Sequence, residues 1–177
     1  MRLSAAVRPI RHVAQIREYA DEPVPDAVVA ELLELARWTG SSRNRQPWHF
    51  IVVRDRDHLR QIAALRPNIS WVAGAPAGIA LVFDGTGNDY DEGRLAERLL
   101  TGATLLGLGG GVAFYGDDTH EASAKRLLGI PADKAAHEIV TIGHPRSKKD
   151  PRPTGPSRGR KPLAELVSYE RWGQPKK

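Results

Sequence analysis

Thr39-Gly-Ser-Ser-Arg-Asn-Arg-Gln-Pro-Trp48, followed directly by His49-Phe-Ile-Val-Val53, is the segment most informative about the fold. Before it, apolar residues recur at helical spacing between Pro25-Asp26 and Gly40, which predicts a helix. The residues that form this apolar face are Val28, Val29, Leu32, Leu33 and Ala36. The apolar run after Pro47 predicts a strand. The connection between them carries two hydroxyls, two primary amides and two guanidiniums, more hydrogen-bonding capacity than a loop needs. We therefore expect something polar to bind there.

The composition narrows the class of protein. A chain of 177 residues fits one domain, residues 1–177, with a substantial core. It contains no cysteine, which excludes disulfides, thiolate nucleophiles and cysteine-ligated metals. No apolar stretch approaches the roughly 20 residues that span a bilayer, and the first residues lack the apolar core of a signal peptide. We therefore expect a soluble, cytoplasmic protein that has no membrane partner.

The positive charge is concentrated in one proline-rich basic loop at about residues 144–161. This segment holds seven basic residues and one acidic residue, a formal charge of +6 in a chain whose total is +5. Two interpretations are open, a solvated loop and a nucleic-acid contact. Aromatic residues are not interleaved with the charges, as they are on surfaces that bind single strands. We therefore expect no nucleic-acid partner.

Hydrophobic periodicity predicts helices and strands in alternation. The helices are expected at 4–13, 26–40, 55–65, 91–106, 119–128 and 163–169, with Thr119 capping the fifth and Gly129 ending it. The strands are expected at 48–53, 78–83, 109–114 and 138–142, the third being a strand or an extended turn, and residues 19–25 form an extended link. Pro67 and Asn68 are expected to form a turn. This order indicates an α+β or α/β sandwich over one sheet.

Several familiar catalytic and binding motifs are absent from the sequence. The six histidines never pair at metal-ligand spacing, so no metal site is predicted. The glycines at 107–111 follow a helix, and Val112 stands where a dinucleotide-binding loop needs its third glycine. Neither a GxSxG element nor a Walker lysine is present. No side chain stands out as a catalytic nucleophile, acid or base. An enzyme of this sequence is therefore expected to draw its chemistry from a bound cofactor.

A series of motifs in fixed order resembles the FMN-dependent nitroreductase family. The matching elements are Ile16-Arg-Glu-Tyr-Ala-Asp-Glu-Pro-Val-Pro25, Leu32-Leu-Glu-Leu-Ala-Arg37, Ser41-Ser-Arg-Asn-Arg-Gln-Pro-Trp48, Asp91-Glu-Gly-Arg94, Leu106-Gly-Leu-Gly109, Leu127-Leu-Gly-Ile-Pro131 and Ile142-Gly-His-Pro145, with Arg160-Lys-Pro-Leu-Ala-Glu165 and Glu170-Arg-Trp-Gly173 at the end. They cover nearly the whole chain. The Ser41–Trp48 element is the most specific of them.

The resemblance implies a fold, a cofactor and an activity. Members of the family are homodimers with an α+β fold, a three-layer α-β-α sandwich around a mostly antiparallel sheet, and they bind FMN at the subunit interface. They pass electrons from NAD(P)H to small electron-poor acceptors such as nitroaromatics and quinones, by a ping-pong mechanism. Three alternatives stay open: a non-catalytic protein that binds flavin or deazaflavin, a flavin-fragmenting enzyme, and a peptide-oxidising enzyme.

The resemblance assigns Ser41, Ser42 and Asn44 to a flavin held mainly by the other subunit. The pyrimidine edge of a flavin presents carbonyl acceptors beside an N–H donor. Asn44 and Gln46 suit this edge because each primary amide is both donor and acceptor. A local alternative is that the serines cap the helix end and Gln46 satisfies the backbone.

The resemblance also implies three cationic contacts. Arg17 corresponds to a basic residue near the flavin N1 and the C2 carbonyl, where negative charge gathers on reduction. The alternative is that Arg17 is an ordinary surface arginine. Arg158 and Arg160 match a basic pair that binds the FMN phosphate, and their i, i+2 spacing turns both to one side of an extended chain.

The sequence departs from the family pattern before Arg17. Val13-Ala14-Gln15 stands where many members carry an Arg-Arg-Ser or Arg-His-Ser element, so an expected phosphate arginine is missing. Arg11 or His12 is the candidate to replace it, and Gln15 joins Arg11 among the candidate cofactor contacts. Trp71 stands where some members have a lysine that reaches the flavin, while Asn68 can still contribute an amide.

The last group of candidates lies in the segment that follows the glycines. Small residues at Gly110 and Gly111 allow the backbone to approach one flavin face, with the N–H groups of 112–115 directed at the reactive N5. The alternative is close packing of a helix end against the sheet. Phe114 and Trp71 are expected to flank the substrate pocket.

Overall fold

The protein is built around a four-stranded sheet. The computed structural model describes residues 4–85, 88–147 and 161–174. The strands are β1 (Trp48–Val53), β2 (Ala77–Asp84), β3 (Gly109–Phe114) and β4 (Lys134–Gly143). Their order is β1-β2-β4-β3, and every neighbouring pair is antiparallel. β1 and β3 are therefore the two edges of this sheet.

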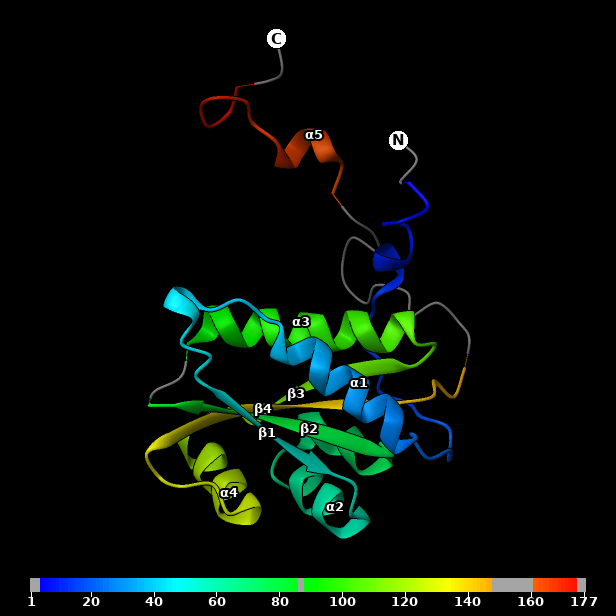
Figure 1. Ribbon diagram of the computed structural model, residues 1–177, viewed down its shortest axis with the longest axis vertical. Helices are drawn as coiled ribbons and strands as arrows, with labels where there is room; N and C mark the ends of the chain where they lie inside the picture. Colours follow the sequence, from blue (N-terminus) through cyan, green and yellow to red (C-terminus); the bar gives the residue numbers. More distant parts are fainter. Residues whose placement is uncertain (1–3, 86–87, 148–160, 175–177) are drawn as a thin grey trace.

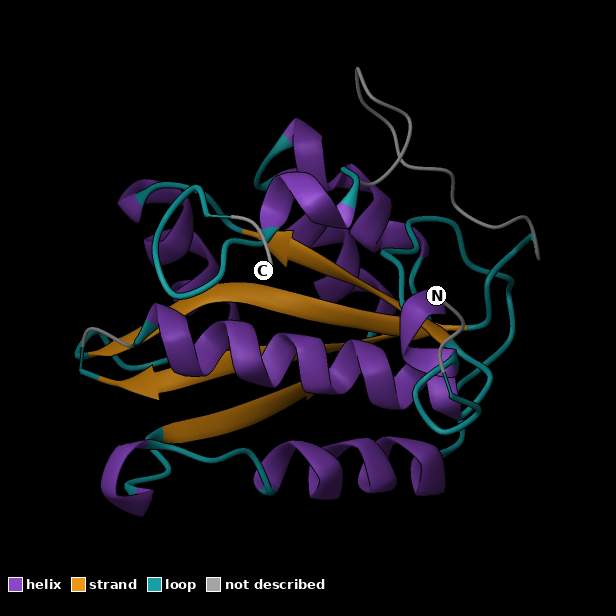
Figure 2. Cartoon of the chain, turned by 90° about the horizontal axis from the view of Figure 1, so that it is seen from above, coloured by secondary structure: helices purple, strands orange, loops and turns teal. Residues whose placement is uncertain are grey.

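Helices cover both faces of the sheet. α1 (Asp26–Arg37) and α3 (Asp89–Leu105) lie on one face, and α2 (Arg56–Ala64) and α4 (Asp118–Leu128) lie on the other (Figure 1). Figure 2, seen from above, shows α1 and α3 side by side and running roughly along the strands. The predicted three-layer α-β-α sandwich with an antiparallel sheet is confirmed.

β2 fills the centre of the molecule because its side chains are buried on both faces. Ile79, Leu81 and Phe83 pack into the cluster under α1 and α3. Ala80 and Val82 pack into a second cluster under α2 and α4. Alternate residues of a strand point to opposite faces, so one apolar run serves both clusters.

Polar side chains fix where the helices begin. Asp55 accepts a hydrogen bond from the backbone N of His58 at 2.8 Å, which caps α2. Asp117 accepts from the backbone N of Thr119 and of His120, both at 3.1 Å. The prediction that Thr119 caps this helix is therefore wrong, because the carboxylate two residues earlier takes the cap. Gly129 ends α4 in the left-handed conformation, as expected.

Four predicted elements need correction. Residues 4–13 do not form one helix. They contain a single 3-10 segment, η1 (Pro9–His12), because Pro9 cannot continue a helix from its preceding turn. α5 (Leu163–Leu166) is one turn long and stops before Tyr169. The expected turn at Pro67 is a 3-10 helix, η3 (Pro67–Gly74), with Ile69 and Val72 buried. β4 begins four residues before the predicted start.

None of the helices within these described ranges is both long and apolar enough to cross a membrane.

Candidate functional site

The segment before α1 extends the sheet at the outer edge of β3. Gln15 forms a parallel bridge with Gly110, and the backbone N of Ile16 donates to Gly110 O at 2.7 Å. Further along, Tyr19 forms an antiparallel bridge with Pro145. Residues 15–19 are thus held as an added piece of strand. This fixes the backbone of the predicted flavin contact Arg17.

The buried hydroxyls of Tyr19 and Thr141 also hold residues 15–19 in place through hydrogen bonds. The Tyr19 hydroxyl lies 2.7 Å from Thr141 Oγ1 and 2.9 Å from Ile16 O. Thr141 Oγ1 also donates to Gly111 O at 3.0 Å. Burial raises the pKa of Tyr19 to about 12, and the hydrogen bond to Thr141 only partly opposes it. The Tyr19 hydroxyl therefore keeps its proton at neutral pH and remains a donor in this network.

The guanidinium of Arg17 lies over the ring of Trp71, with Cζ 5.7 Å from the ring centroid. Trp71 Nε1 in turn donates to Asn68 O at 3.1 Å. The ring rests on β3, because a Cβ added at Gly111 would meet Trp71 Cη2 at 2.8 Å. The structure therefore brings Arg17, Asn68 and Trp71 together beside the β3 edge.

The β3 edge presents a defined set of backbone groups. The backbone N of Tyr115 donates to His137 O, so the odd-numbered residues of β3 face β4 and the even-numbered ones face outward. Among the outward groups, Val112 N donates to Gln15 Oε1 at 3.1 Å. Phe114 O accepts from Arg66 Nη1 at 3.3 Å. The N–H of Phe114 points outward from the same edge.

This geometry corrects the prediction that all N–H groups of residues 112–115 face a ligand. Val112 N is engaged by Gln15, and Tyr115 N by the neighbouring strand. The glycines are also packed against protein. A Cβ at Gly110 would meet Leu100 Cδ2 at 2.7 Å, and one at Gly111 would meet Ile16 O at 2.4 Å. The space that a Cβ would occupy at each of these glycines is therefore filled by protein. This agrees with the alternative interpretation, in which the glycines allow close packing against the helix and the sheet.

The loop before β1 carries the other candidates and is held by local contacts. Ser41 Oγ accepts from Gln46 N at 2.8 Å, and Gln46 Nε2 donates to Asn44 O at 3.3 Å. Arg43, Asn44 and Gln46 have positive φ angles of 54°, 53° and 49°. Such a conformation costs an L-residue about 1–2 kcal/mol. Strain of this kind concentrates at functional sites. Ser42 begins the 3-10 turn of the loop, and its side chain is exposed.

The two groups of candidates lie at diagonally opposite corners of the sheet. Trp48, where the loop enters β1, pairs with Phe83 near the end of β2. At the other edge Gly110 pairs with Ile142, which pairs with Ala77 at the start of β2. Three strand spacings of about 4.8 Å also separate β1 from β3, roughly 14 Å. One chain therefore does not bring its 41–46 loop to its own Arg17.

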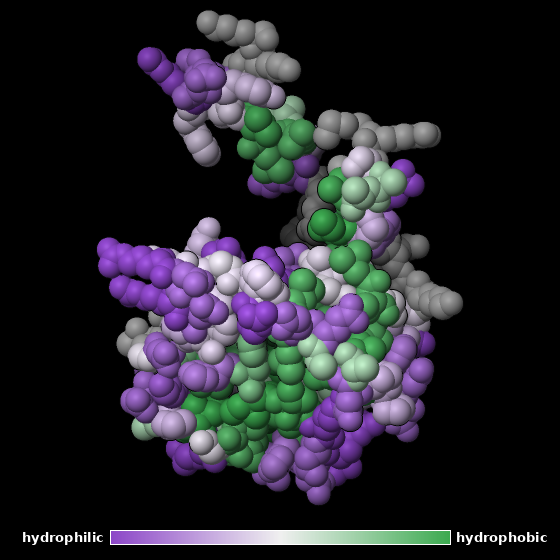
Figure 3. All heavy atoms as spheres, viewed as in Figure 1, coloured by the Kyte–Doolittle hydropathy of each residue, from purple (hydrophilic) through white to green (hydrophobic). Residues whose placement is uncertain are grey.

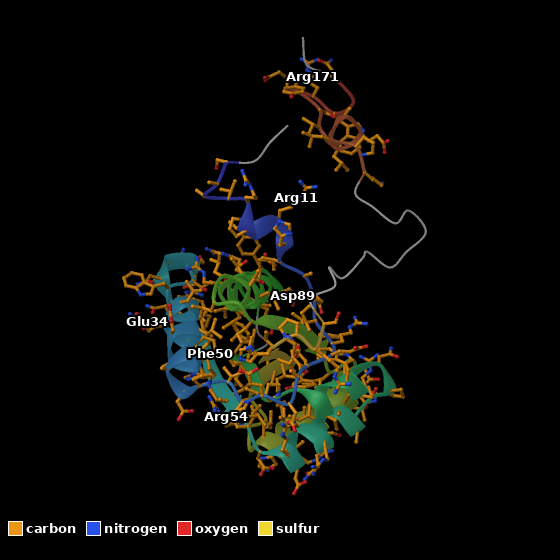
Figure 4. The ribbon with its side chains drawn as sticks, turned by 90° about the vertical axis from the view of Figure 1, so that its right-hand side faces the viewer. Arg11, Glu34, Phe50, Arg54, Asp89 and Arg171 are labelled. Atoms are coloured by element: carbon orange, nitrogen blue, oxygen red, sulfur yellow. The ribbon has the colours of Figure 1, made fainter. Side chains whose placement is uncertain are left out.

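The candidates for phosphate binding lie on the N-terminal segment or outside the described residues. Arg11 is exposed on η1, and Figure 4 shows it on the N-terminal segment, outside the sandwich. Arg158 and Arg160 fall outside the described residues, as does most of the basic loop. The contacts of Arg11, Arg158 and Arg160 with a phosphate therefore stay predictions, as do the contacts of the other candidates with a flavin ring.

One cluster of ionisable groups could not be read from sequence spacing, because its members are far apart in the chain. His137 Nδ1 lies 2.7 Å from Glu92 Oε1, and His137 Nε2 lies 3.8 Å from Glu121 Oε2. Burial disfavours the imidazolium, but the hydrogen bond and charge of Glu92 together with the charges of Glu121 and Asp89 outweigh this effect, so the pKa of His137 is raised. Asp89, labelled in Figure 4, forms with Glu92 and His137 a group whose possible ligand atoms lie within 4.8 Å of one another. A charge-assisted hydrogen bond accounts for this geometry.

A partly buried carboxyl, Glu138 on β4, neighbours this cluster opposite the end of β3. Glu138 pairs with Phe114 across the β3–β4 ladder. Burial, and then the charge of Glu92, raises the pKa of Glu138 to about 7. The Phe114 ring is half exposed and lies 6.4 Å from the His137 ring, centroid to centroid. The outward edge of β3 thus ends beside Glu138, a carboxyl that changes charge near neutral pH.

The C-terminal segment, residues 161–174, carries exposed apolar side chains among charged ones. Leu163 and Leu166 on α5 are 64% and 61% exposed, and Trp172 is 98% exposed. Figure 1 shows this segment standing away from the sandwich, and Figure 3 shows apolar side chains gathered on it. Side chains of this kind are normally covered by protein.

Comparison with known proteins gives matches along most of the chain. The model of the nitroreductase family matches residues 14–86. A protein of Archaeoglobus fulgidus with the provisional name NADH dehydrogenase/NAD(P)H nitroreductase is 31% identical over 143 residues, which cover 76% of this chain and 82% of the relative.

Solved structures match more of the chain at lower identity. A protein of Parabacteroides distasonis with the same provisional name gives a TM-score of 0.83 at 23% identity, covering 96% of this chain and 100% of the other. An FMN-dependent nitroreductase from Clostridium difficile gives 0.78 at 24% identity, covering 90% and 95%. At these identities the likeness shows the fold.

Proposed function

The chain belongs to the nitroreductase family, and from that premise we propose that it is an FMN-dependent oxidoreductase that transfers electrons from NAD(P)H to small electron-poor acceptors. The observation that carries the proposal is the β3 edge, where Arg17 stands beside outward-facing backbone groups. Nitroaromatics and quinones are the acceptor class we expect.

The residues at the two corners fit the chemistry of a flavin. The β3 edge offers a cation at Arg17, an amide at Gln15 and the outward N–H of Phe114. The 41–46 loop offers the hydroxyl of Ser42 and the amides of Asn44 and Gln46. Together they supply both donors and acceptors, which the pyrimidine edge of a flavin requires. FMN, when bound, would supply hydride acceptance and electron transfer to a second substrate in a ping-pong cycle.

We propose that each site takes its two corners from two subunits of a homodimer. The positions of the corners support this, because in one chain they lie on opposite edges of the sheet. The exposed α5 segment supports it too, since Leu163, Leu166 and Trp172 need a protein surface to cover them. A second copy of this chain is the partner we propose.

The side chains act by binding and orienting rather than as acids or bases. Arg17 carries a fixed positive charge, which favours the binding of a ring that gains negative charge. The Asn44 amide aligns the ring from the other subunit. Phe114 and Trp71 line the approach with aromatic surface and limit the access of water. Arg158 and Arg160, with Arg11 as a further candidate, are proposed to hold the phosphate.

Purification followed by steady-state kinetics tests this function. We expect a yellow protein whose denaturation releases FMN, identified by mass, and which oxidises NADH or NADPH when a nitroaromatic or quinone is present. A colourless protein that takes up no added FMN would contradict the cofactor. Bound FMN without turnover of either nicotinamide would contradict the enzyme and favour a flavin-binding protein. A deazaflavin in the released fraction would contradict FMN specifically.

A further inference from the structure

We propose that Trp71 is a positioning residue that fixes the guanidinium of Arg17 at the β3 edge and thereby raises the reduction potential of the bound flavin. The inference rests on the proposed function and deepens it. It assigns a task to Trp71, which the family resemblance placed beside the flavin pocket without a role in binding the cofactor.

The contact between Arg17 and Trp71 is the starting point. Arg17 Cζ lies 5.7 Å from the Trp71 ring centroid, within the range of a cation–π interaction, and indole is the most effective ring for it. Among the residues that the structure describes, Trp71 is the side chain over which this guanidinium lies. Arginine side chains have many rotamers in solution. The Trp71 ring therefore favours one position of the Arg17 guanidinium, which would otherwise be mobile on an extended segment.

Trp71 is itself held on three sides, so it can serve as a fixed platform. Its Nε1 donates to Asn68 O at 3.1 Å. Its ring lies against Gly111, where a Cβ would come within 2.8 Å of Cη2 and 2.9 Å of Cζ3. The neighbouring residue Val72 is fully buried in the cluster under α2 and α4. The platform is thus tied to both β3 and η3.

The charge of Arg17 remains available to a ligand. No carboxylate within the described part of the chain forms an ion pair with it, and its side chain is exposed. A cation next to a flavin binds the reduced, more negative flavin better than the oxidised flavin. This difference in binding raises the reduction potential of the flavin. The difference shrinks when the cation is mobile, because Coulomb energy falls with distance and with solvation.

The test compares four variants by FMN titration and by spectroelectrochemistry of the holoprotein. In Arg17→Gln, we expect the affinity for reduced FMN to fall about tenfold more than the affinity for oxidised FMN, which lowers the two-electron potential by about 30 mV. In Trp71→Leu, which removes the π face, we expect about a threefold effect, roughly 14 mV. Trp71→Phe keeps a face and should stay closer to wild type. The double variant should match Arg17→Gln alone, because Trp71 acts through Arg17.

A second readout needs no flavin and guards against a loss of folding. In the flavin-free protein, the side-chain protons of Arg17 should be shifted upfield in NMR spectra by the indole ring current. The shift should disappear in Trp71→Leu and in Trp71→Met, with thermal unfolding of both recorded as the control.

The outcomes separate the inference from the function on which it rests. Wild-type protein that binds no FMN overturns both. FMN binding with an unchanged potential in Trp71→Leu, while Arg17→Gln lowers it, overturns the positioning role alone. A double variant whose potential falls by the sum of the two single effects also overturns it, because Trp71 would then act independently of Arg17.

Discussion

The two corners of the sheet that carry the candidate residues are built in different ways. The β3 corner is close-packed, with the segment 15–19, Trp71 and Gly111 in mutual contact and a buried hydroxyl pair beneath them. The loop at 41–46 has exposed polar side chains, local hydrogen bonds and three residues in the left-handed region. The first corner therefore provides a rigid edge with a fixed cation, whereas the second provides donors and acceptors on a strained loop.

The greatest loss should come from breaking the packing of the β3 corner. Gly111→Val places side-chain atoms where Ile16 O and the Trp71 ring now lie. We expect a loss of about 2–3 kcal/mol in the free energy of unfolding, measured by denaturant titration, because overpacking forces backbone shifts. FMN affinity should fall with it, since Arg17 and Trp71 move.

Gly74→Val is the matched control for this substitution. Gly74 ends η3, and a Cβ added there would have no atom within 4 Å and would need no positive φ angle. The unfolding free energy of this variant should change by less than about 0.5 kcal/mol. Equal losses at the two glycines would show that the β3 corner is no more tightly packed than the surface.

A smaller effect on stability comes from the ionisation of Glu138, which lies opposite the end of β3. The pKa of Glu138 is raised to about 7, above its value in an unfolded chain, so ionising it in the folded state carries a cost. That cost is absent below the unfolded pKa, near 4.3, and grows until the pH passes the folded pKa. Glu138→Gln removes it. The stability gained by the variant should therefore be larger at pH 8 than at pH 5, by on the order of 2 kcal/mol.

Denaturation of wild type and Glu138→Gln at both pH values measures this difference. A gain of the same size at pH 5 and pH 8 would mean that Glu138 titrates at an ordinary pKa.

The sequence was sufficient for the sandwich because its core helices and strands have clear periods. β2 is one continuous apolar run, and α1 and α3 carry regular apolar faces. It was insufficient for residues 4–13, where Pro9 leaves only a 3-10 turn, and for η3, where short-range spacing suggested no helix.

The candidate site shows the same division. The loop composition at 41–46 indicated a binding region directly, because so many polar groups follow one another. The contact of Trp71 with Arg17 and the contact of Glu92 with His137 depend on packing between elements that are far apart in the sequence, which no local pattern encodes. The predicted roles of Gly110 and Val112 overlooked the segment at 15–19, which occupies the β3 edge.

The weakest effect on stability concerns the strain of the loop. Arg43→Gly and Asn44→Gly each relieve a positive φ angle, at 54° and 53°. The relief, reduced by the greater chain entropy of glycine, should raise the unfolding free energy by about 0.5–1 kcal/mol for Arg43→Gly, and by less for Asn44→Gly because asparagine tolerates the left-handed region. Only Asn44→Gly removes an amide proposed to contact the flavin, so only that variant should bind FMN more weakly. Equal FMN affinities would argue against Asn44 as a ligand.

Subunit complementation determines whether each site combines the β3 corner of one chain with the 41–46 loop of another. One variant carries Gln15→Ala and Arg17→Ala, and the other carries Asn44→Ala and Gln46→Ala. Each alone should bind FMN weakly. After the two are unfolded together and refolded as a mixture, half the dimers are mixed and each contains one intact site, so about a quarter of the wild-type FMN sites should return. A mixture that binds no more FMN than its two components would contradict the shared site, because a site built within one chain stays defective in every dimer.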